Sequence, residues 1–312
     1  MKTIQFKVKT ALIGVLTMGL SFLANGQTKT LVDVNRSYPN IQKVEVNGGS
    51  LEIRFVGSQR PDVQVEAFLE SNYHNQDIVF VQVGGVLKIN RKLEGSSGSW
   101  NNVRTKGHIY IYGPETTEVV MQGGSGQIHV EQVKHPETTI QIGSGKVTVK
   151  NITGNLDIQA GSGNLNISGV KGNIQAKVSS GRTEIMDVEG DVNYFSSSGN
   201  ITMQNIKGIA NITKTSGYAK LENIQELGMV RLTSGNLTAT EVGLGKTTAF
   251  YGTSGNMRIK TVSNLSEFNF RIMSSSGNIT IGNTRGKTLQ IDNNAETTIQ
   301  GNITSGNFSI TN

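Results

Sequence analysis

The chain of 312 residues contains no cysteine, four prolines and a single tryptophan. The absence of cysteine excludes disulfides, thiolate metal sites, a cysteine nucleophile and the lipid-modified cysteine that anchors bacterial lipoproteins. No helical periodicity is evident after the first 26 residues, and the 38 glycines suit many tight corners between strands. The stability of the fold must therefore come from stacked strands around a continuous apolar core.

The first 26 residues have the composition of a secretory signal peptide. Three lysines precede an apolar run over residues 11–24, and small residues follow up to Gly26. We expect cleavage before Gln27 and export to the periplasm, the outer cell surface or the medium. No later segment approaches the roughly 20 consecutive apolar residues of a membrane-spanning helix, so we expect no transmembrane span in the mature chain.

The charge of the chain gives no indication of a nucleic-acid partner. The formal net charge of +6 falls to +3 once the three lysines of the leader are removed. Because nucleic-acid binding proteins carry a strong basic excess on one face, this small surplus predicts no nucleic-acid binding.

A Ser-Gly pair recurs every 18 residues through the centre of the chain. Counted from the serine, positions 4, 6 and 9 are largely apolar, and so are positions 13 and 15. Apolar residues at every second place are typical of strands, because successive side chains of an extended chain point to opposite faces. One repeat therefore predicts strand, corner, strand, corner. The six pairs begin at Ser144, Ser162, Ser180, Ser198, Ser216 and Ser234.

This period predicts an all-β fold, a single-stranded parallel β-solenoid (β-helix) with coils of about 18 residues. Residues 121–312 form its regular part. The spacing widens after Ser234, so we expect insertions to project as loops, above all over residues 244–251 and 261–268. Residues 27–120 alternate apolar and polar residues without the 18-residue Ser-Gly repeat, and we interpret them as an atypical N-terminal cap of strands with the first coils.

The remaining columns of the repeat suit corners. Position 8 carries mostly Asn, Asp and Gly, which tolerate left-handed backbone angles. Coils stack about 4.8 Å apart, so equivalent Asn or Ser side chains can form hydrogen-bonded ladders. Position 8 is occupied by Asn151, Gly169, Asp187, Asn205, Asn223 and Glu241.

The Ser-Gly-Asn-apolar pattern that begins at Ser162, Ser198, Ser234 and Ser276, behind a signal peptide, resembles the bacterial putative-adhesin β-strand-repeat family. It is also similar to the related autotransporter-adhesin "head GIN" domain. The resemblance covers residues 40–312 and implies a β-solenoid fold in an exported bacterial protein, with an adhesin-like role by analogy.

A polysaccharide-acting β-helix enzyme is the alternative function, and it needs clustered carboxylates on one outer face. The best local group is Glu184, Asp187, Glu189 and Asp191. In the 18-residue register, Glu184, Asp187 and Asp191 have no carboxylate directly above or below them. We interpret the group as turn residues, with a weak calcium site as the open alternative, and predict no catalytic residue.

No cofactor or metal site is predicted either. The four histidines, His74, His108, His129 and His135, share no metal-ligand spacing. Glycine-rich stretches are not followed by a helix or by a Lys-Ser/Thr pair that would hold phosphate.

Exposed aromatic residues are the better binding candidates, because rings stack on sugars and on partner side chains. The candidates are Trp100 in a polar loop, Phe195 and Tyr218, whereas Tyr194 should point inward. We predict a non-catalytic adhesin-like or envelope-interaction protein that presents a repetitive polar surface. Its expected partner is an envelope or extracellular polymer or a surface protein.

Overall fold

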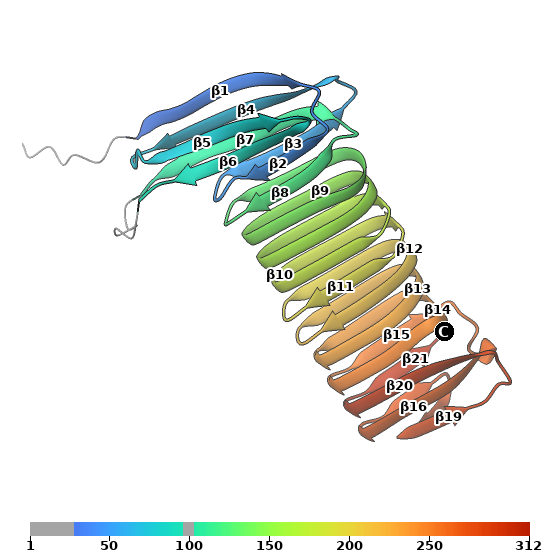
Figure 1. Ribbon diagram of the computed structural model, residues 1–312. Helices are drawn as coiled ribbons and strands as arrows, with labels where there is room; N and C mark the ends of the chain where they lie inside the picture. The colour runs from blue at the N-terminus through green and yellow to red at the C-terminus, as the bar shows by residue number, and fades with distance from the viewer. Residues whose placement is uncertain (1–27, 96–102) are drawn as a thin grey trace, which may run out of the picture.

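The computed structural model describes residues 28–95 and 103–312, and these residues form an all-β stack of coils (Figure 1). All described strands belong to one continuous 21-stranded sheet. The 3-10 turn η1 (Leu265–Glu267) is the one helical element of the described part. The prediction of an all-β, solenoid-like architecture is confirmed. The expected signal peptide and Trp100 lie outside the described residues.

Six strands that pair in parallel form the centre of the stack. Parallel pairing joins residues 18 apart, so that Ile185 lies between Ile167 and Met203. Tyr194 in the same way lies between Ala176 and Ile212. The strands are β9 (Gln127–Lys171), β10 (Ile174–Glu189), β11 (Val192–Ser196), β12 (Asn200–Lys214), β13 (Tyr218–Ser234) and β14 (Asn236–Ser254).

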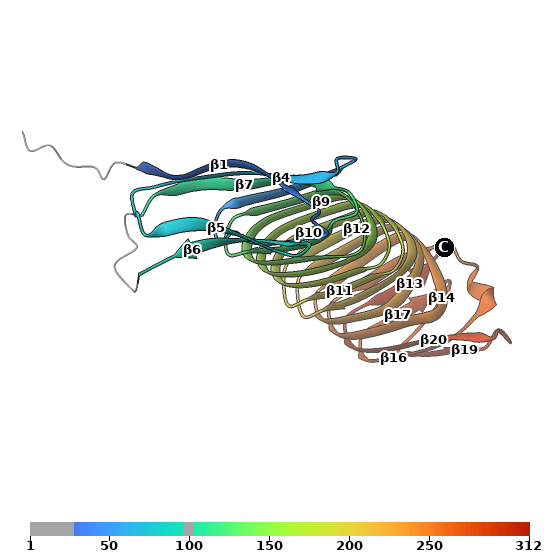
Figure 2. The ribbon, with the colours of Figure 1, turned by 45° about the horizontal axis from the view of Figure 1, so that its top comes forward.

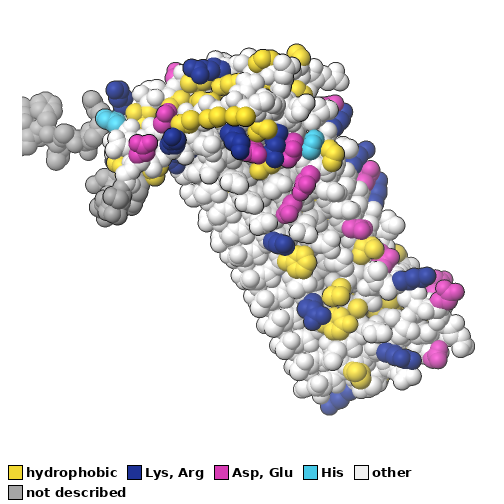
Figure 3. Space-filling view, viewed as in Figure 1, with side chains coloured by type: hydrophobic (Ala, Val, Ile, Leu, Met, Phe, Trp, Pro, Cys, Tyr) yellow, Lys and Arg dark blue, Asp and Glu magenta, His cyan; other side chains and the backbone are white. Residues whose placement is uncertain are grey.

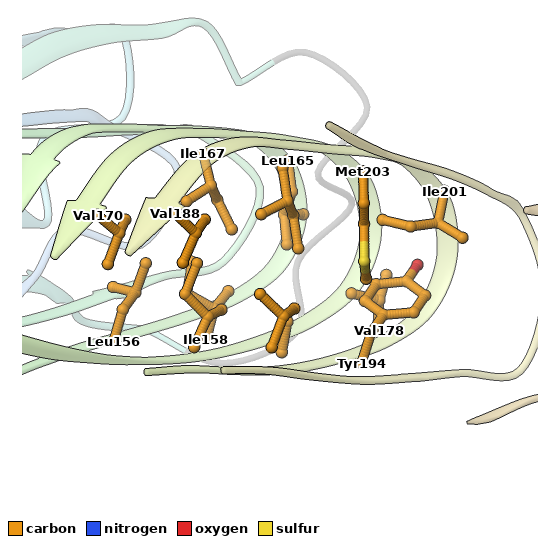
Figure 4. Packing of buried hydrophobic residues seen from close by; sticks show 14 of the residues in the cluster. Leu156, Ile158, Leu165, Ile167, Val170, Val178, Val188, Tyr194, Ile201 and Met203 are labelled. Carbon is orange, nitrogen blue, oxygen red and sulfur yellow. The ribbon is translucent and has the colours of Figure 1, made fainter. Parts of the chain in front are cut away.

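Each repeat contributes to two outer faces. The Ile185 face contains Arg182–Met186 and the segments paired with it, and the Phe195 face contains β11 and the segments paired with it. The apolar columns of the two faces point toward one another inside the stack, as Leu165 and Ile167 do above Val178 and Ile158 (Figure 4).

The predicted core columns are buried. Ile167, Val170, Ile185 and Val188 are all 0% exposed. Burial of one such side chain contributes about 1.5–3 kcal/mol. Because every coil repeats the same columns, the core is continuous along the whole stack.

The corners adopt the backbone angles that their residues permit. Asn151, Asp187, Asn205 and Asn223 have φ angles of 55°, 56°, 57° and 54°. Asn205 Nδ2 donates a hydrogen bond to Asp187 Oδ1 at 2.8 Å, and Asn223 Nδ2 donates to Asn205 Oδ1 at 2.9 Å. The predicted corner ladder is therefore present, and it occupies hydrogen-bonding groups of these side chains.

The N-terminal end of the stack does not follow chain order (Figure 2). β2 lies parallel between β6 and β8, and β3 lies parallel between β7 and β9. Antiparallel pairs close this end: β1 with β4, β4 with β7, and β5 with β6. The strands are β1 (Lys29–Pro39), β2 (Lys43–Asn47), β3 (Glu52–Ser58), β4 (Asp62–Ser71), β5 (Gln76–Val83), β6 (Val86–Leu93), β7 (Thr105–Pro114) and β8 (Glu118–Gly123).

The C-terminal end is rearranged in a similar way. β20 lies between β14 and β16, and β21 lies between β15 and β17, so the last segment of the chain is an inner layer. The short antiparallel strands β18 and β19 lie outside β17 and β16. The strands are β15 (Met257–Thr261), β16 (Phe268–Ser276), β17 (Ile279–Ile281), β18 (Thr284–Gly286), β19 (Thr288–Ile291), β20 (Thr297–Ser305) and β21 (Phe308–Thr311).

One predicted loop is wrong and the other is present. Residues 244–251 belong to β14, and Phe250 is fully buried because its large ring fills the core beside Phe308. The inserted residues of β14 lie between Leu244 and Ala249. They shift the register of the pairing with β13 between Leu227 and Met229. Residues 262–267, in contrast, leave the sheet and include η1.

Candidate functional site

A groove of about 890 Å³ runs across the coils on the Phe195 face, beside the Ser-Gly corner. Two columns of the repeat form it. The residue before each Ser-Gly serine forms the floor, and the outward residue two places earlier forms the wall. The floor column is Gly124, Gly143, Gly161, Ser179 and Ser197, and the wall column is Gln122, Gln141, Gln159, Lys177 and Phe195.

Glycine in the floor is a consequence of how closely the coils approach. A Cβ atom at Gly161 would lie 2.4 Å from the carbonyl oxygen of Gly143, and one at Gly143 would lie 2.7 Å from that of Gly124. A larger residue at Gly143 or Gly161 would press on the backbone of the coil before it. The floor is therefore open at these glycines, whereas Ser179 and Ser197 continue the column in the later coils.

The wall presents unpaired amides. Gln122, Gln141 and Gln159 are exposed and succeed one another on coils about 4.8 Å apart. Their side chains make no hydrogen bond to the part of the protein that the structure describes, unlike the corner ladder of Asn205 and Asp187. Each amide therefore has one acceptor and two donor hydrogens free for a ligand.

An aromatic and a basic side chain end the wall. Lys177 and Phe195 are direct partners in the parallel pairing of β10 and β11. Phe195 is 42% exposed, and Lys177 is exposed without an ion pair to any described carboxylate. The groove thus combines hydrogen-bonding amides with a ring face and a cation, which together suit hydroxyl-bearing ligands.

The three predicted binding residues do not meet in one site. Phe195 lies in the groove, whereas Tyr218, 40% exposed, lies across the Ser-Gly corner at the start of β13, paired with Asn236. Trp100 falls outside the described residues. Tyr194 points inward, as predicted, and its hydroxyl donates to Thr183 Oγ1 at 3.2 Å. The glutamine column was missed, although the 18-residue register already aligned Gln141 and Gln159.

A second groove, of about 690 Å³, lies on the other side of the Ser-Gly corner. It is lined by serines and glycines together with Glu52, Gln127, Lys146 and Asn164. No aromatic side chain lines it, so its surface offers fewer ways to hold a ligand than the groove at Phe195.

Three of the four carboxylates that could serve an enzyme, all except Glu184, are engaged with neighbouring coils. Asp187 accepts from Asn205, and Asp191 Oδ1 accepts from the backbone N–H of Ile209 at 2.8 Å. Glu189 lies 3.2 Å from Lys207 Nζ and 3.7 Å from Lys171 Nζ. The hydrogen bond from Lys207, with the charge of Lys171, lowers the pKa of the Glu189 carboxyl. Glu184 has only Asn166 and Thr202 as stacking neighbours.

Two features are absent from residues 28–95 and 103–312. No three histidine, aspartate or glutamate side chains gather there to hold a metal ion. No helix in those ranges has the length and apolarity to cross a membrane.

The chain is similar to several solved structures. One is a putative adhesin from Parabacteroides merdae, 13% identical, with 92% of this chain and 98% of that chain covered and a TM-score of 0.35. Another is a putative adhesin from Bacteroides fragilis, 12% identical, with 90% and 97% covered and a TM-score of 0.32. A third is a putative lipid binding protein from Parabacteroides distasonis, 12% identical, with 92% and 98% covered and a TM-score of 0.31.

Among curated proteins, none matches this chain. The Toastrack DUF4097 family matches residues 41–226 and, in a second overlapping match, residues 172–311. These matches span almost all of the described chain, and they agree with the adhesin-like family that the Ser-Gly-Asn repeat resembles. The protein therefore belongs to the Toastrack DUF4097 family.

Proposed function

We propose that this protein is an exported, non-catalytic, adhesin-like protein that binds an extended polymer along the groove of the Phe195 face. In this proposal, a parallel β-solenoid with coils of about 18 residues over 121–312, capped by residues 27–120, is a rigid support for the groove. The observation that carries the proposal is the row of unpaired amides, Gln122, Gln141 and Gln159, that ends at Phe195.

The physical basis is the summation of weak contacts on one rigid body. Each coil adds one outward amide to the groove wall, and a polymer that runs across the coils meets these groups in succession. Single hydrogen bonds to sugar hydroxyls are weak in water, but linked contacts reinforce one another through effective concentration. The ring of Phe195 adds a stacking surface at the end of the row.

Binding of the mature protein to immobilised polysaccharides tests the proposal, with Phe195→Ala as the main variant. We expect it to weaken binding several-fold, and Gln141→Ala with Gln159→Ala to weaken it further. Tyr218→Ala is the matched control, because this aromatic side chain is equally exposed but lies outside the groove. Trp100→Ala tests whether this residue, which lies outside the described residues, contributes to binding.

Two results would contradict the proposal. The first is that the wild type binds no polymer, or that Phe195→Ala binds as well as the wild type. The second is that the purified protein shortens a polysaccharide and loses this activity in Glu184→Gln or Asp187→Asn. Export is tested separately by mass spectrometry of secreted or periplasmic protein, for which we expect an N-terminus at Gln27.

A further inference from the structure

We propose that the polymer is an acidic polysaccharide, held along the Phe195 face from Lys177 toward the C-terminal end of the stack. This inference rests on the proposed function and names the ligand class of the same face. It is carried by basic residues on that face, by their aromatic neighbours and by the fact that these basic residues form no ion pair with a described carboxylate.

The basic residues recur at every third coil. From Lys177 the outward column passes through Phe195 and Thr213 to Arg231. It then passes through Tyr251 and Asn302 to the coil of β16, which carries Arg271 beside Met273. With coils about 4.8 Å apart, Lys177, Arg231 and Arg271 are separated by steps of about 14 Å along the stack.

An aromatic residue follows each of the first two basic residues. Phe195 is the stacking neighbour of Lys177, and Tyr251 is that of Arg231. The guanidinium carbon of Arg231 lies 4.7 Å from the centre of the Tyr251 ring. Figure 3 shows basic side chains next to hydrophobic ones on coils that are otherwise mostly polar and uncharged. A cation beside a ring offers an acidic sugar both a charge and a stacking face.

From the Lys177 coil to the β16 coil the two outward columns of this face carry no carboxylate, whereas Asp157 stacks on Gln175 in the coil before Lys177. Among the described outward residues of this face from Gln175 to the β16 coil, the others are amides, threonine, alanine, methionine and the two aromatics. Lys177, Arg231 and Arg271 have no ion pair to a described carboxylate, whereas lysines elsewhere do, among them Lys43, Lys134 and Lys207. Their charge is therefore available to an anionic partner.

The spacing favours an acidic polysaccharide over a nucleic acid. A nucleic-acid strand carries one phosphate per about 3.4 Å, and proteins that bind it present a dense basic groove. One cation per about 14 Å, with uncharged side chains between, is instead matched to a chain rich in hydroxyls with occasional anionic groups.

The test compares four polymers at low and physiological salt: a polyuronate, a sulfated galactan, a neutral xylan and single-stranded DNA. The wild type should prefer an acidic polysaccharide to the xylan, and salt should weaken that preference. The polyuronate carries only carboxylates as its anionic groups and the galactan only sulfates, so a comparison of the two shows which anionic group the protein prefers. Arg231→Gln with Arg271→Gln, both exposed and outside the groove, should weaken acidic binding roughly tenfold at low salt and leave xylan binding unchanged.

The control, Lys150→Gln with Lys260→Gln, removes two charges from the Ile185 face. Both lysines are exposed and form no ion pair with a described carboxylate. It should retain acidic binding. Equal loss in the control, equal binding of xylan by the wild type, or DNA binding as tight as that of the polyuronate would each overturn the inference. Xylan binding that still depends on Phe195 would leave the proposed function standing, whereas no polymer binding at all would remove both.

Discussion

Lys214 Nζ donates a hydrogen bond to the carbonyl oxygen of Gly199 at 2.9 Å inside the core, with only 2% of Lys214 exposed. The lysine occupies an inward column that Val178 and Leu232 fill with apolar side chains in other coils. Its amine also lies 5.7 Å from the centre of the Tyr194 ring. Burial lowers the pKa of the Lys214 amine, because the charged form loses its hydration.

The first prediction concerns pH. An unfolded lysine titrates near 10.5, above the pKa of the buried Lys214 amine. Between these two pKa values the unfolded chain binds a proton that the folded protein does not, so the contribution of Lys214 to the unfolding free energy rises with pH toward 10.5. Relative to Lys214→Met, the thermal midpoint of the wild type should therefore increase from neutral to alkaline pH.

Circular dichroism melts across this pH range give the measurement. The difference between two variants isolates Lys214 from other groups that titrate at alkaline pH, such as Tyr194, whose pKa burial raises. Lys150→Met, at an exposed position, is the control and should show no such trend. A wild-type to Lys214→Met difference that stays constant with pH would contradict the prediction.

The second prediction tests the core column. Ile185→Asp places a carboxylate at a position with 0% exposure and no partner, and should cost roughly 3–5 kcal/mol. Thr238→Asp is the control, because this outward residue lies between Lys220 and Arg258. It should change stability by less than about 0.5 kcal/mol. Hydrogen exchange that showed Ile185 in a solvated segment would disprove the coil register.

The centre of the fold could be predicted from the sequence because one rule repeats there. In an 18-residue period with two-residue alternation, Ile185 must face inward and Asn205 must lie at a corner. Neither statement depends on contacts between distant parts of the chain. The stacking of equivalent positions then predicts hydrogen bonds such as that from Asn205 to Asp187.

The ends could not be predicted, because their neighbours are distant in sequence and carry no period. Lys43 pairs with both Val86 and Glu118, and nothing in the local alternation of these strands specifies that order. The groove was predictable only in part. The 18-residue register aligns its glutamine column, but only the structure shows that Gln141 keeps a free amide while Asn205 does not.

The third prediction separates two kinds of corner glycine. Gly169 has a φ of 68°, close to the angles of its Asn neighbours in the column. The atom nearest to a Cβ there would be the movable Oδ1 of Asn151, at 2.8 Å, and the backbone of Asn151 would lie at ordinary contact distance, 3.4 Å or more. Gly169→Asn should be neutral or stabilise by up to about 1 kcal/mol, because it restricts the unfolded chain.

Gly181→Asn should behave in the opposite way. Gly181 has a φ of 125°, and a Cβ atom there would lie 1.8 Å from the backbone oxygen of Gly163. A fixed backbone atom cannot yield as a side chain can, so we expect a loss of at least about 2 kcal/mol. Thermal melts of the two variants measure the contrast, and equal midpoints would refute it.

The last prediction concerns the C-terminal end. Phe308 lies four residues before the end of the sequence, where chains commonly fray. In the structure it is 1% exposed, its ring centre lies 5.1 Å from that of Phe250, and its strand is held between β15 and β17. Phe308→Ala should therefore cost about 3–5 kcal/mol, as in the middle of a core. Phe195→Ala, which removes an exposed ring, should cost less than about 0.5 kcal/mol. If the two variants melted together near the wild-type midpoint, β21 would be a frayed end and not an inner layer of the stack.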